Sequence, residues 1–599
     1  MKIRRLITFA ISAILLAGVV SANAAQPLQI DRSTRPAEPS FGFSITDDNF
    51  SGYGAYSSIS GAKRGGFTTN VECTSVSDPK CAEADNLRVS VIVPPCPANY
   101  DATDVCIKSL RTADSTGTLQ NATLQYEAET NKFPKDLANQ LPAGGGGSVW
   151  RGASSKGGTL DYAVVVDLQI NWYRTAQPGL GNTQKWVVGY SAQVIPVKIK
   201  SGNYYPVYWK YWDSPNSGKV ISSEPQLPAG VTSYDPWFDC VIVDKGRCAL
   251  ADTFHADQKI ELALQMDNTV AGWMFGRMKD TKVSAVPISK DSSLLTVEGA
   301  SINVPFGHAW VPIKEIPTGT PSLQEFARLQ KIIGNDITSE WFNWGRPSNH
   351  QDLFQFSETG LLGGERFIPS PTVAGVGMFV GIEPWLKTIS TTPTWRFQGM
   401  SPSSFWGMDQ TSANKVWGCT VNDKTKLHGL MTTNAMAYSW SPPALKDEFL
   451  SYKVAGAHLD ADGSVYKGTY NLSMNAESAK CIYGFTDAPI QATVSISKEG
   501  GETTNVATEL LSIQNGWMNL SANNFTFSDP TIKIKLTQEK VVTKPTPSAT
   551  PIATPSVTPS TAAPSKVGVK KISITCVKGK TKKVVTGTKP VCPAGYKKK

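Results

Sequence analysis

The sequence predicts a mainly β protein: several antiparallel β-sandwich-like domains with few short helices, a Pro/Thr-rich disordered linker and a small basic C-terminal hairpin. Runs in which Val, Ile, Thr and aromatic residues alternate with polar residues recur along the chain, separated by 50 glycines and 39 prolines. Such runs are typical of strands joined by turns. A length of 599 residues exceeds what one hydrophobic core holds, so at roughly 100 to 200 residues per domain we expect three or four units.

The first 24 residues have the pattern of a cleavable signal peptide. Basic residues at positions 2, 4 and 5 precede an apolar run from Leu6 to Val20, and Ala22-Asn23-Ala24 forms an A-x-A cleavage site. The apolar run is shorter than the roughly 18 residues expected of a membrane span. We therefore expect a secreted chain that begins at Ala25 and has neither a transmembrane segment nor a lipid anchor.

Residues 25–315 are predicted to form an N-terminal β-rich region of one or two domains. Four consecutive glycines, 144–147, are interpreted as flexible punctuation within it. Its most regular strand patterns lie at 87–93, 162–170 and 192–200.

Residues 316–410 are predicted to form a Gly/Pro-rich region that contains a helix. Ser322 and Glu325 make an S-x-x-E capping box, apolar residues recur at helical spacing after them, and Gly334 ends the pattern.

Residues 411–536 are predicted to form a C-terminal β-sandwich. Asp462-Gly463 lies between two alternating runs, which favours a hairpin turn. The alternative, a calcium loop, fails because an EF-hand needs Gly at its sixth position and Glu at its twelfth. Strands are expected at 481–485, 492–498, 505–514, 517–522 and 531–538.

The last 63 residues predict a linker followed by a basic tail. Residues 537–565 repeat proline among Thr, Ser and Ala, a composition that favours an extended spacer. In residues 566–599, two short strands are expected around Gly579, clipped by a disulfide. So short a unit needs that disulfide, which typically contributes about 2 to 4 kcal/mol.

Ten cysteines form an even set, as expected of an exported protein. No C-x-x-C pair occurs and histidine is scarce, so no metal or cofactor is expected. Sequential pairing is predicted: Cys73 with Cys81, Cys96 with Cys106, Cys240 with Cys248, Cys419 with Cys481, and Cys576 with Cys592.

Charge is distributed unevenly. The chain has a net charge of +9, yet residues 566–599 contain eleven lysines and no acid, and the signal peptide and linker are also positive, which leaves −6 for residues 25–536. A basic tail behind a stiff spacer indicates contact with an anionic cell-envelope polymer, with Lys597, Lys598 and Lys599 as candidate binding residues. The alternative is a solubility tag that binds nothing. Nucleic acid is a poor partner outside the cell.

The tail ITCVKGKTKKVVTGTKPVCPAGYKKK resembles a C-terminal module found on many secreted actinobacterial proteins of unknown function. CIYGFTDAPIQATVSI, NGWMNLSANNFTFSDPTIKIKLTQ and GWMFGRMKD are similar to segments of the same group. The resemblance covers mainly the C-terminal third, implies export and cell-surface retention, and supplies no catalytic residues.

An aromatic stretch at 204–212 is the main binding candidate in the rest of the chain. On a strand, Tyr204, Tyr208 and Trp212 share one face, and a flat aromatic row can stack on sugar rings or on a partner protein. The alternative is core packing in a sheet that is covered on both faces.

Catalytic motifs do not emerge. There is no G-x-S-x-G elbow and no H-E-x-x-H helix, and His308 in VPFGHAW is interpreted as structural. The sequence therefore favours a non-catalytic secreted or surface-displayed protein that binds a glycan or protein partner or acts in adhesion. The alternative is a secreted carbohydrate-active enzyme, whose two carboxylates come from distant strands and leave no spacing signal.

Overall fold

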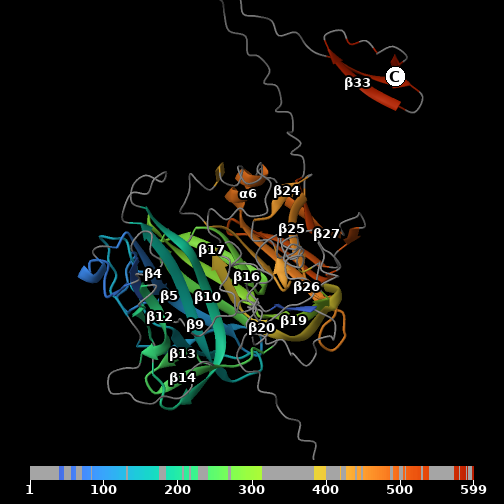
Figure 1. The fold of residues 1–599 in the computed structure, drawn as a ribbon. Helices are drawn as coiled ribbons and strands as arrows, with labels where there is room; N and C mark the ends of the chain where they lie inside the picture. Colours follow the sequence, from blue (N-terminus) through green and yellow to red (C-terminus); the bar gives the residue numbers. More distant parts are fainter. Residues whose placement is uncertain are drawn as a thin grey trace, which may run out of the picture. The chain divides into compact units, whose positions relative to one another are not determined.

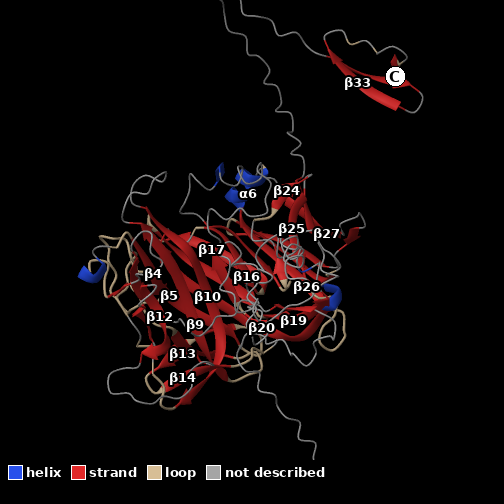
Figure 2. Cartoon of the chain, in the orientation of Figure 1, coloured by secondary structure: helices blue, strands red, loops and turns tan. Residues whose placement is uncertain are grey.

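The computed structural model of the chain consists mainly of strands (Figures 1 and 2), as predicted. It has two compact units, Met1–Lys540 and Val541–Lys599, here called the body and the C-terminal unit. The residues that the structure describes are 40–45, 56–62, 71–81, 84–129, 132–173, 184–205, 208–214, 218–226, 240–255, 257–267, 271–312, 379, 383–399, 418–419, 427–438, 442–446, 449–485, 490–497, 503–505, 508–527, 531–538, 572–578, 581–587, 590, 592 and 596–598.

A 15-stranded sheet forms the centre of the body, and its neighbouring strands come from distant parts of the sequence. It takes strands from both sides of residue 411, the predicted start of the C-terminal sandwich. In spatial order its main path is β29 (Thr508–Gln514), β30 (Trp517–Thr526), β26 (Lys467–Asn475), β22 (Leu427–Thr433), β16 (Gly272–Arg277), β21 (Arg396–Gly399), β10 (Gln184–Ser201), β9 (Thr159–Tyr173), β4 (Asn86–Ile92), β2 (Ser58–Ala62) and β3 (Val71–Cys73).

Four further strands extend this sheet at its side. Strand β14 (Arg247–Ala251) pairs with β10 and with β13 (Cys240–Asp244), and β8 (Ser148–Ala153) pairs with β9 and with β7 (Thr123–Glu127). The pairings are antiparallel except for β16 with β22, which run parallel.

Smaller sheets complete the two units. The five-stranded sheet is β17 (Lys279–Pro287), β18 (Ser292–Ala300), β15 (Lys259–Asp267), β5 (Cys106–Ala113) and β6 (Leu119–Asn121); the six-stranded sheet is β23 (Ala437–Tyr438), β25 (Phe449–Ala455), β31 (Thr531–Gln538), β27 (Ile490–Ser497) and β28 (Thr503–Asn505), with β24 (Ala444–Lys446) beside β25. The others are β1 (Ser40–Ile45), β19 (Ile302–Pro312) and β20 (Leu386–Thr394); β11 (Tyr208–Ser214) and β12 (Gly218–Gln226); and, in the C-terminal unit, β33 (Thr581–Gly587), β32 (Ile572–Lys578) and β34 (Lys597–Lys598). Short helices are η3 (Pro79–Cys81), η5 (Glu383–Trp385) and α6 (Ala476–Tyr483).

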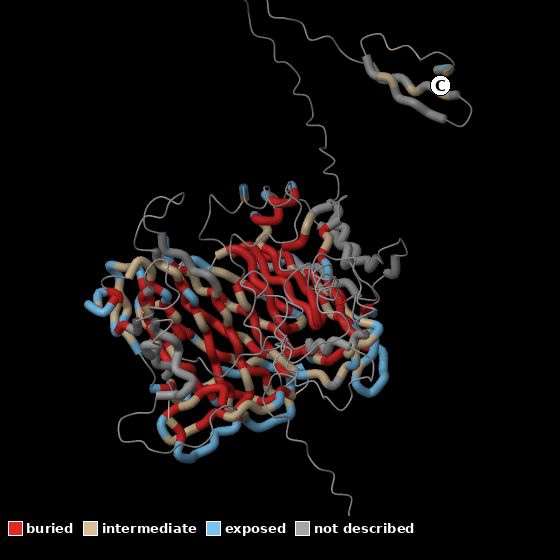
Figure 3. The backbone as a smooth tube through the Cα atoms, viewed as in Figure 1, coloured by how far each residue is buried: buried red, intermediate tan, exposed pale blue. Residues whose placement is uncertain are grey.

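The middle of the large sheet is buried on both faces: every residue of β16 and β22 is buried, and Figure 3 shows mainly buried residues in this part of the body. One core lies between it and the five-stranded sheet, where residues such as Val164 and Val166 of β9 meet Leu262 and Leu264 of β15. A second core joins β16, β26 and β30 to β25 and α6. Alternate residues of β16 belong to different cores, because successive side chains of a strand point to opposite faces of the sheet.

Residues 481–485 were predicted as a strand, but 476–483 form helix α6. The Asn475 side chain caps the helix by accepting hydrogen bonds from the backbone N–H groups of Glu477 and Ser478, and Gly484 ends it in the left-handed conformation at φ 74°. Both are standard helix signals. Strand alternation in 481–485 is too short to outweigh them.

The remaining strand predictions agree with the structure where it describes them. Strand β4 covers most of 87–93, while β9 and β10 contain 162–170 and 192–200. The predicted turn at Asp462-Gly463 is present, with Gly463 at φ 82° and a bridge between Leu459 and Val465. The predicted helix at 322–334, the signal peptide and most of the linker lie outside the described residues.

Glycines 144–147 are buried and hydrogen-bonded, so their interpretation as flexible punctuation was wrong. Gly144 pairs with Phe133 in both directions, and the N–H of Gly145 donates to the carbonyl of Ile92. A Cβ at Gly145 would lie 2.7 Å from the Cβ of Pro94. Glycine is required here because neighbouring segments approach the backbone closely.

Aromatic rings lie over glycines on neighbouring strands of the large sheet. The Tyr190 ring lies over Gly399, and the register places Phe525 opposite Gly468; in both pairs a Cβ built on the glycine would collide with the ring. Trp273 covers Gly429 in the same manner across the parallel pair. These glycines thus create the space that buries large rings within the sheet.

A buried arginine closes the second core. Arg277, at the end of β16, has no exposed surface, and its Nη1 donates to the carbonyls of Thr433 and Ala435 at 2.8 and 2.6 Å. Its guanidinium lies 4.8 Å from the ring centroid of Tyr438, which in turn stacks on Phe275. Carbonyl dipoles and π faces stabilise the charge.

Four of the five predicted disulfides are present: Cys73–Cys81, Cys96–Cys106, Cys240–Cys248 and Cys419–Cys481. Cys592 is disulfide-bonded as well, and no described cysteine is free. The side chain of Cys576, its predicted partner, lies outside the described residues. Three of the four bridges close loops of only 8 to 10 residues.

The denatured, non-reduced protein is expected to contain no reactive thiol, because every cysteine is predicted to be paired. Titration with a thiol reagent in guanidinium chloride checks this, and the reduced protein should then titrate ten thiols. Two reactive thiols before reduction would contradict sequential pairing.

Replacing Gly399 by alanine is expected to lower the free energy of unfolding by about 1 to 3 kcal/mol, because the new methyl group collides with the Tyr190 ring. Gly189→Ala is the control, since nothing lies within 4 Å of a Cβ built there. Urea unfolding measures both variants. Equal losses would show that the ring over Gly399 is not the cause.

Candidate functional site

The C-terminal unit contains the tail lysines predicted to bind a polyanion. Its central strand β32 pairs with β33 on one side, from Ile572 opposite Gly587 to Lys578 opposite Thr581. The last strand, β34, pairs with the other side of β32. The expected hairpin is therefore present, and a third strand is added to it.

The strand register brings two lysine segments together. Lys583 of β33 and Lys598 of β34 both lie opposite Cys576, one on each side. Lys582 and Lys597 lie in the same way on either side of Val577. Because neighbouring strands are about 4.8 Å apart, each row spans about 10 Å.

Five tail lysines belong to this end of the sheet, next to the β32–β33 turn. We call it the lysine end, and it comprises Lys578, Lys582, Lys583, Lys597 and Lys598. Lys580 and Lys599 adjoin these residues in sequence and lie outside the described residues. The side chain of Lys597 is exposed. Residues 566–599 contain no acidic side chain to offset this charge.

Sequence reasoning named Lys597, Lys598 and Lys599 but missed the lysines around the turn. A signal for them exists in KGKTKK at 578–583, where lysines flank a Gly-containing hairpin turn. Their proximity to the last three residues depends on the pairing of β34 with β32, which no local pattern specifies.

The aromatic stretch does not form the predicted row. Tyr204 is only 2% exposed and packs with the Cys240–Cys248 disulfide, outside strand β11. Tyr208 and Trp212 lie on β11, where the register with β12 shifts between Trp209 and Tyr211. Tyr204 is therefore a core residue, and the side chains of Tyr208 and Trp212 lie outside the described residues.

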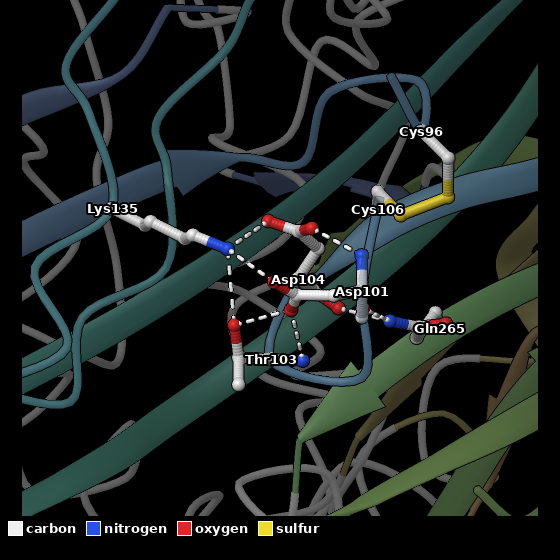
Figure 4. A network of polar contacts seen from close by, with 7 residues as sticks. All are labelled: Cys96, Asp101, Thr103, Asp104, Cys106, Lys135 and Gln265. Atoms are coloured by element: carbon white, nitrogen blue, oxygen red, sulfur yellow. Dashed lines mark hydrogen bonds and ion pairs between the residues drawn. A yellow bond between two sulfur atoms is a disulfide. The ribbon is translucent and has the colours of Figure 1, made fainter. Parts of the chain in front are cut away.

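A polar cluster lies in the loop closed by the Cys96–Cys106 disulfide (Figure 4). Lys135 Nζ donates to Asp104 at 2.8 Å and to Thr103 at 3.0 Å, and Asp101 Oδ1 accepts from the Thr103 N–H at 2.7 Å. Gln265 of β15 donates to the carbonyls of Asp101 and Asp104. These contacts hold the loop against β15, and hydrogen bonds, chiefly from Thr103, lower the pKa of Asp101.

Hydrogen-bonded turns also account for the lowered pKa values of Asp114 and Asp462. Side-chain hydrogen bonds from Thr116 and Gln120 hold the pKa of Asp114 at about 2, and the Ser464 hydroxyl lowers that of Asp462. A general acid needs the opposite shift. These carboxylates stabilise turns.

Asp167 on β9 has a raised pKa. Burial is the main cause, and hydrogen bonds from Gln169 and Ser90, at 2.7 and 3.1 Å, partly offset it. Its hydrogen-bond partners are uncharged. A glycosidase would need a second carboxyl group roughly 5 to 10 Å from the first. The next acid on β9 is Asp161, whose carboxylate is ion-paired with Arg151.

Two histidines are buried. His428 Nδ1 lies 2.7 Å from the Ser478 hydroxyl, but these residues are 2% and 4% exposed. The pair joins β22 to α6 and has no access for a substrate. His308 is 7% exposed within β19, in accord with its structural interpretation.

Within the described residues, no group of three or more His, Cys, Asp and Glu side chains could hold a metal ion. None of the helices in this part of the chain is long and apolar enough to cross a membrane.

No protein-family model, curated protein or solved structure matches the chain. The resemblance of the tail to a secreted actinobacterial module therefore stays a prediction.

Asp167→Asn is expected to raise the free energy of unfolding near pH 7, because it removes a charge that burial disfavours. The folded-state pKa lies above the ordinary value of an aspartate. The wild-type protein therefore regains this stability as pH falls through the folded pKa, so the advantage of the variant should shrink towards about pH 4.

Urea unfolding at both pH values measures the effect. Asp462→Asn is the control of opposite sign: the lowered pKa of Asp462 adds stability at neutral pH that is lost on acidification. An Asp167→Asn protein less stable than wild type at pH 7 would refute the assignment.

Proposed function

We propose that this chain is a secreted or surface-displayed, non-catalytic β-rich protein whose C-terminal unit binds an anionic cell-envelope polymer and so retains the body at the envelope. The observation that carries the proposal is the register of β32, β33 and β34, which gathers lysines from two segments at one end of a small sheet.

Charge separation supports this division of roles. Residues 566–599 carry eleven lysines without an acid, whereas residues 25–536 have a net charge of −6. An anionic polymer attracts the first and weakly repels the second. The C-terminal unit is also separate from the body as a compact unit.

The disulfides support the compartment. Such bonds form and persist in oxidising surroundings such as the cell exterior. Four of them are described in the body, and the sequence begins with a signal-peptide pattern.

The contacts of the body support a structural role for its carboxylates. Asp104 and Glu261 pair with Lys135 and Arg111, and Glu298 contacts both Lys259 and Lys282. We therefore assign no catalytic residue and treat the body as the displayed part.

The full chain is expected to bind isolated cell envelopes at low salt and to be released as salt rises, because exposed charges are screened over roughly 8 to 10 Å at physiological ionic strength. A chain ending at Lys540 should stay in the supernatant. Cosedimentation at increasing sodium chloride measures both.

The melting temperature of the shorter chain should match that of the body in the full chain, which controls for misfolding. Equal retention of both chains, or retention of the full chain in molar salt, would refute electrostatic anchoring and leave the lysines as a solubility device.

A further inference from the structure

We infer that the lysine end, and not the tail charge as a whole, forms the binding site, and that it takes a linear polyanion of high charge density, such as a phosphate polymer, rather than a membrane surface. The inference rests on the proposed function and specifies which residues and which partner it needs.

Lysines from two segments lie close together at the lysine end. The rows through Cys576 and Val577 are adjacent, so four register positions, those of Lys582, Lys583, Lys597 and Lys598, lie within about 10 Å of one another across the sheet. This spacing is comparable to the Debye length at physiological salt. Within each row the two lysine positions share one face of the sheet, so their potentials add, and neutralisation by a polymer segment is favoured over separate counterions.

The second step is the contrast with the other end of the same sheet. The remaining tail lysines are Lys566, Lys570, Lys571 and Lys589. In sequence, the first three precede β32 and the fourth follows β33, at the strand ends that pair Ile572 with Gly587. Among the strands that the structure describes, none pairs with β32 there besides β33, because β34 reaches β32 only at Cys576 and Val577.

The third step is the choice of lysine. The tail has no arginine, and a lysine ammonium is a compact point charge without the planar fork that recognises one carboxylate or phosphate in a fixed geometry. Such a site responds to the charge density of its partner. A polymer with closely spaced phosphates is therefore preferred over one with sparse carboxylates.

The fourth step separates a polymer from a membrane. Successive positions along a strand belong to opposite faces of a sheet, so the row through Cys576 and the row through Val577 belong to different faces. A planar lipid surface can approach one face at a time. A flexible polymer can pass around the end of the sheet and reach both rows.

The Cys592 disulfide supports this arrangement. It lies between β33 and β34, in the segment that returns the chain to β32. Cross-linking this segment lowers the entropy cost of holding the last lysines beside those of the turn.

The test compares two full-length triple variants that lose the same charge. The first carries Lys582→Gln, Lys583→Gln and Lys597→Gln; the second carries Lys566→Gln, Lys570→Gln and Lys589→Gln. Binding to inorganic polyphosphate of defined length is measured by fluorescence anisotropy at 0.15 M salt. We expect the first variant to lose about 100-fold in affinity and the second less than about 10-fold.

A third variant, with Lys582→Arg, Lys583→Arg and Lys597→Arg, should bind within about threefold of wild type, because charge is preserved. Non-reduced peptide mapping confirms that the Cys592 disulfide is intact in each protein. Weak binding by the arginine variant would overturn the charge-density argument.

Three further outcomes test the site, the partner and the proposed function separately. Equal losses in the two glutamine variants would overturn the lysine end as the site while leaving tail binding in place. Stronger binding to vesicles of an anionic phospholipid than to polyphosphate would overturn the polymer as partner. Failure of the wild-type chain to bind polyphosphate, vesicles and envelopes would refute the proposed function itself.

Discussion

Burial of one parallel strand pair on both of its faces determines how the body is arranged. Every residue of β16 and β22 is buried. Met274 and Leu430 enter the core shared with the five-stranded sheet, whereas Phe275 and Met431 enter the core that contains α6. Parallel strands are typically covered on both faces. A layer on each side of the large sheet follows from this requirement.

Polar groups between these layers fix their relative position. Asn471 of β26 donates to the Thr432 hydroxyl, and its Oδ1 accepts from Ser521 of β30 and from the Asp280 N–H of β17. The network thus joins three neighbouring strands of the large sheet to the edge of the five-stranded sheet. A shift of register would leave these polar groups and the Arg277 charge buried without partners, at a cost of several kcal/mol. The polar groups therefore specify one strand pairing.

Local patterns in the sequence predicted local structure and little beyond it. Strands β4, β9 and β10, the short disulfide loops and the turn at Gly463 follow from alternation, spacing and turn chemistry. The order of strands does not, because β16 lies between β21 and β22, whose residues come more than a hundred positions later. The lysine end was predicted only in part for the same reason. The lysines can be read from the sequence, but their proximity depends on the pairing of β34 with β32. For Tyr204 the sequence left a binding row and core packing open, because its burial against Cys240 depends on tertiary contacts.

The strand order also determines when the body can fold. The N-terminal half contributes β10 and β16, which remain open edges until β21 and β22 have been synthesised. Contacts between such distant segments slow folding, and unpaired edges invite association with other chains. The large sheet therefore cannot reach its native order before β21 and β22 are available, although β10, β9, β4, β2 and β3 can already pair. A chain that stops before residue 396 would leave one edge of β10 and both edges of β16 without their native partners.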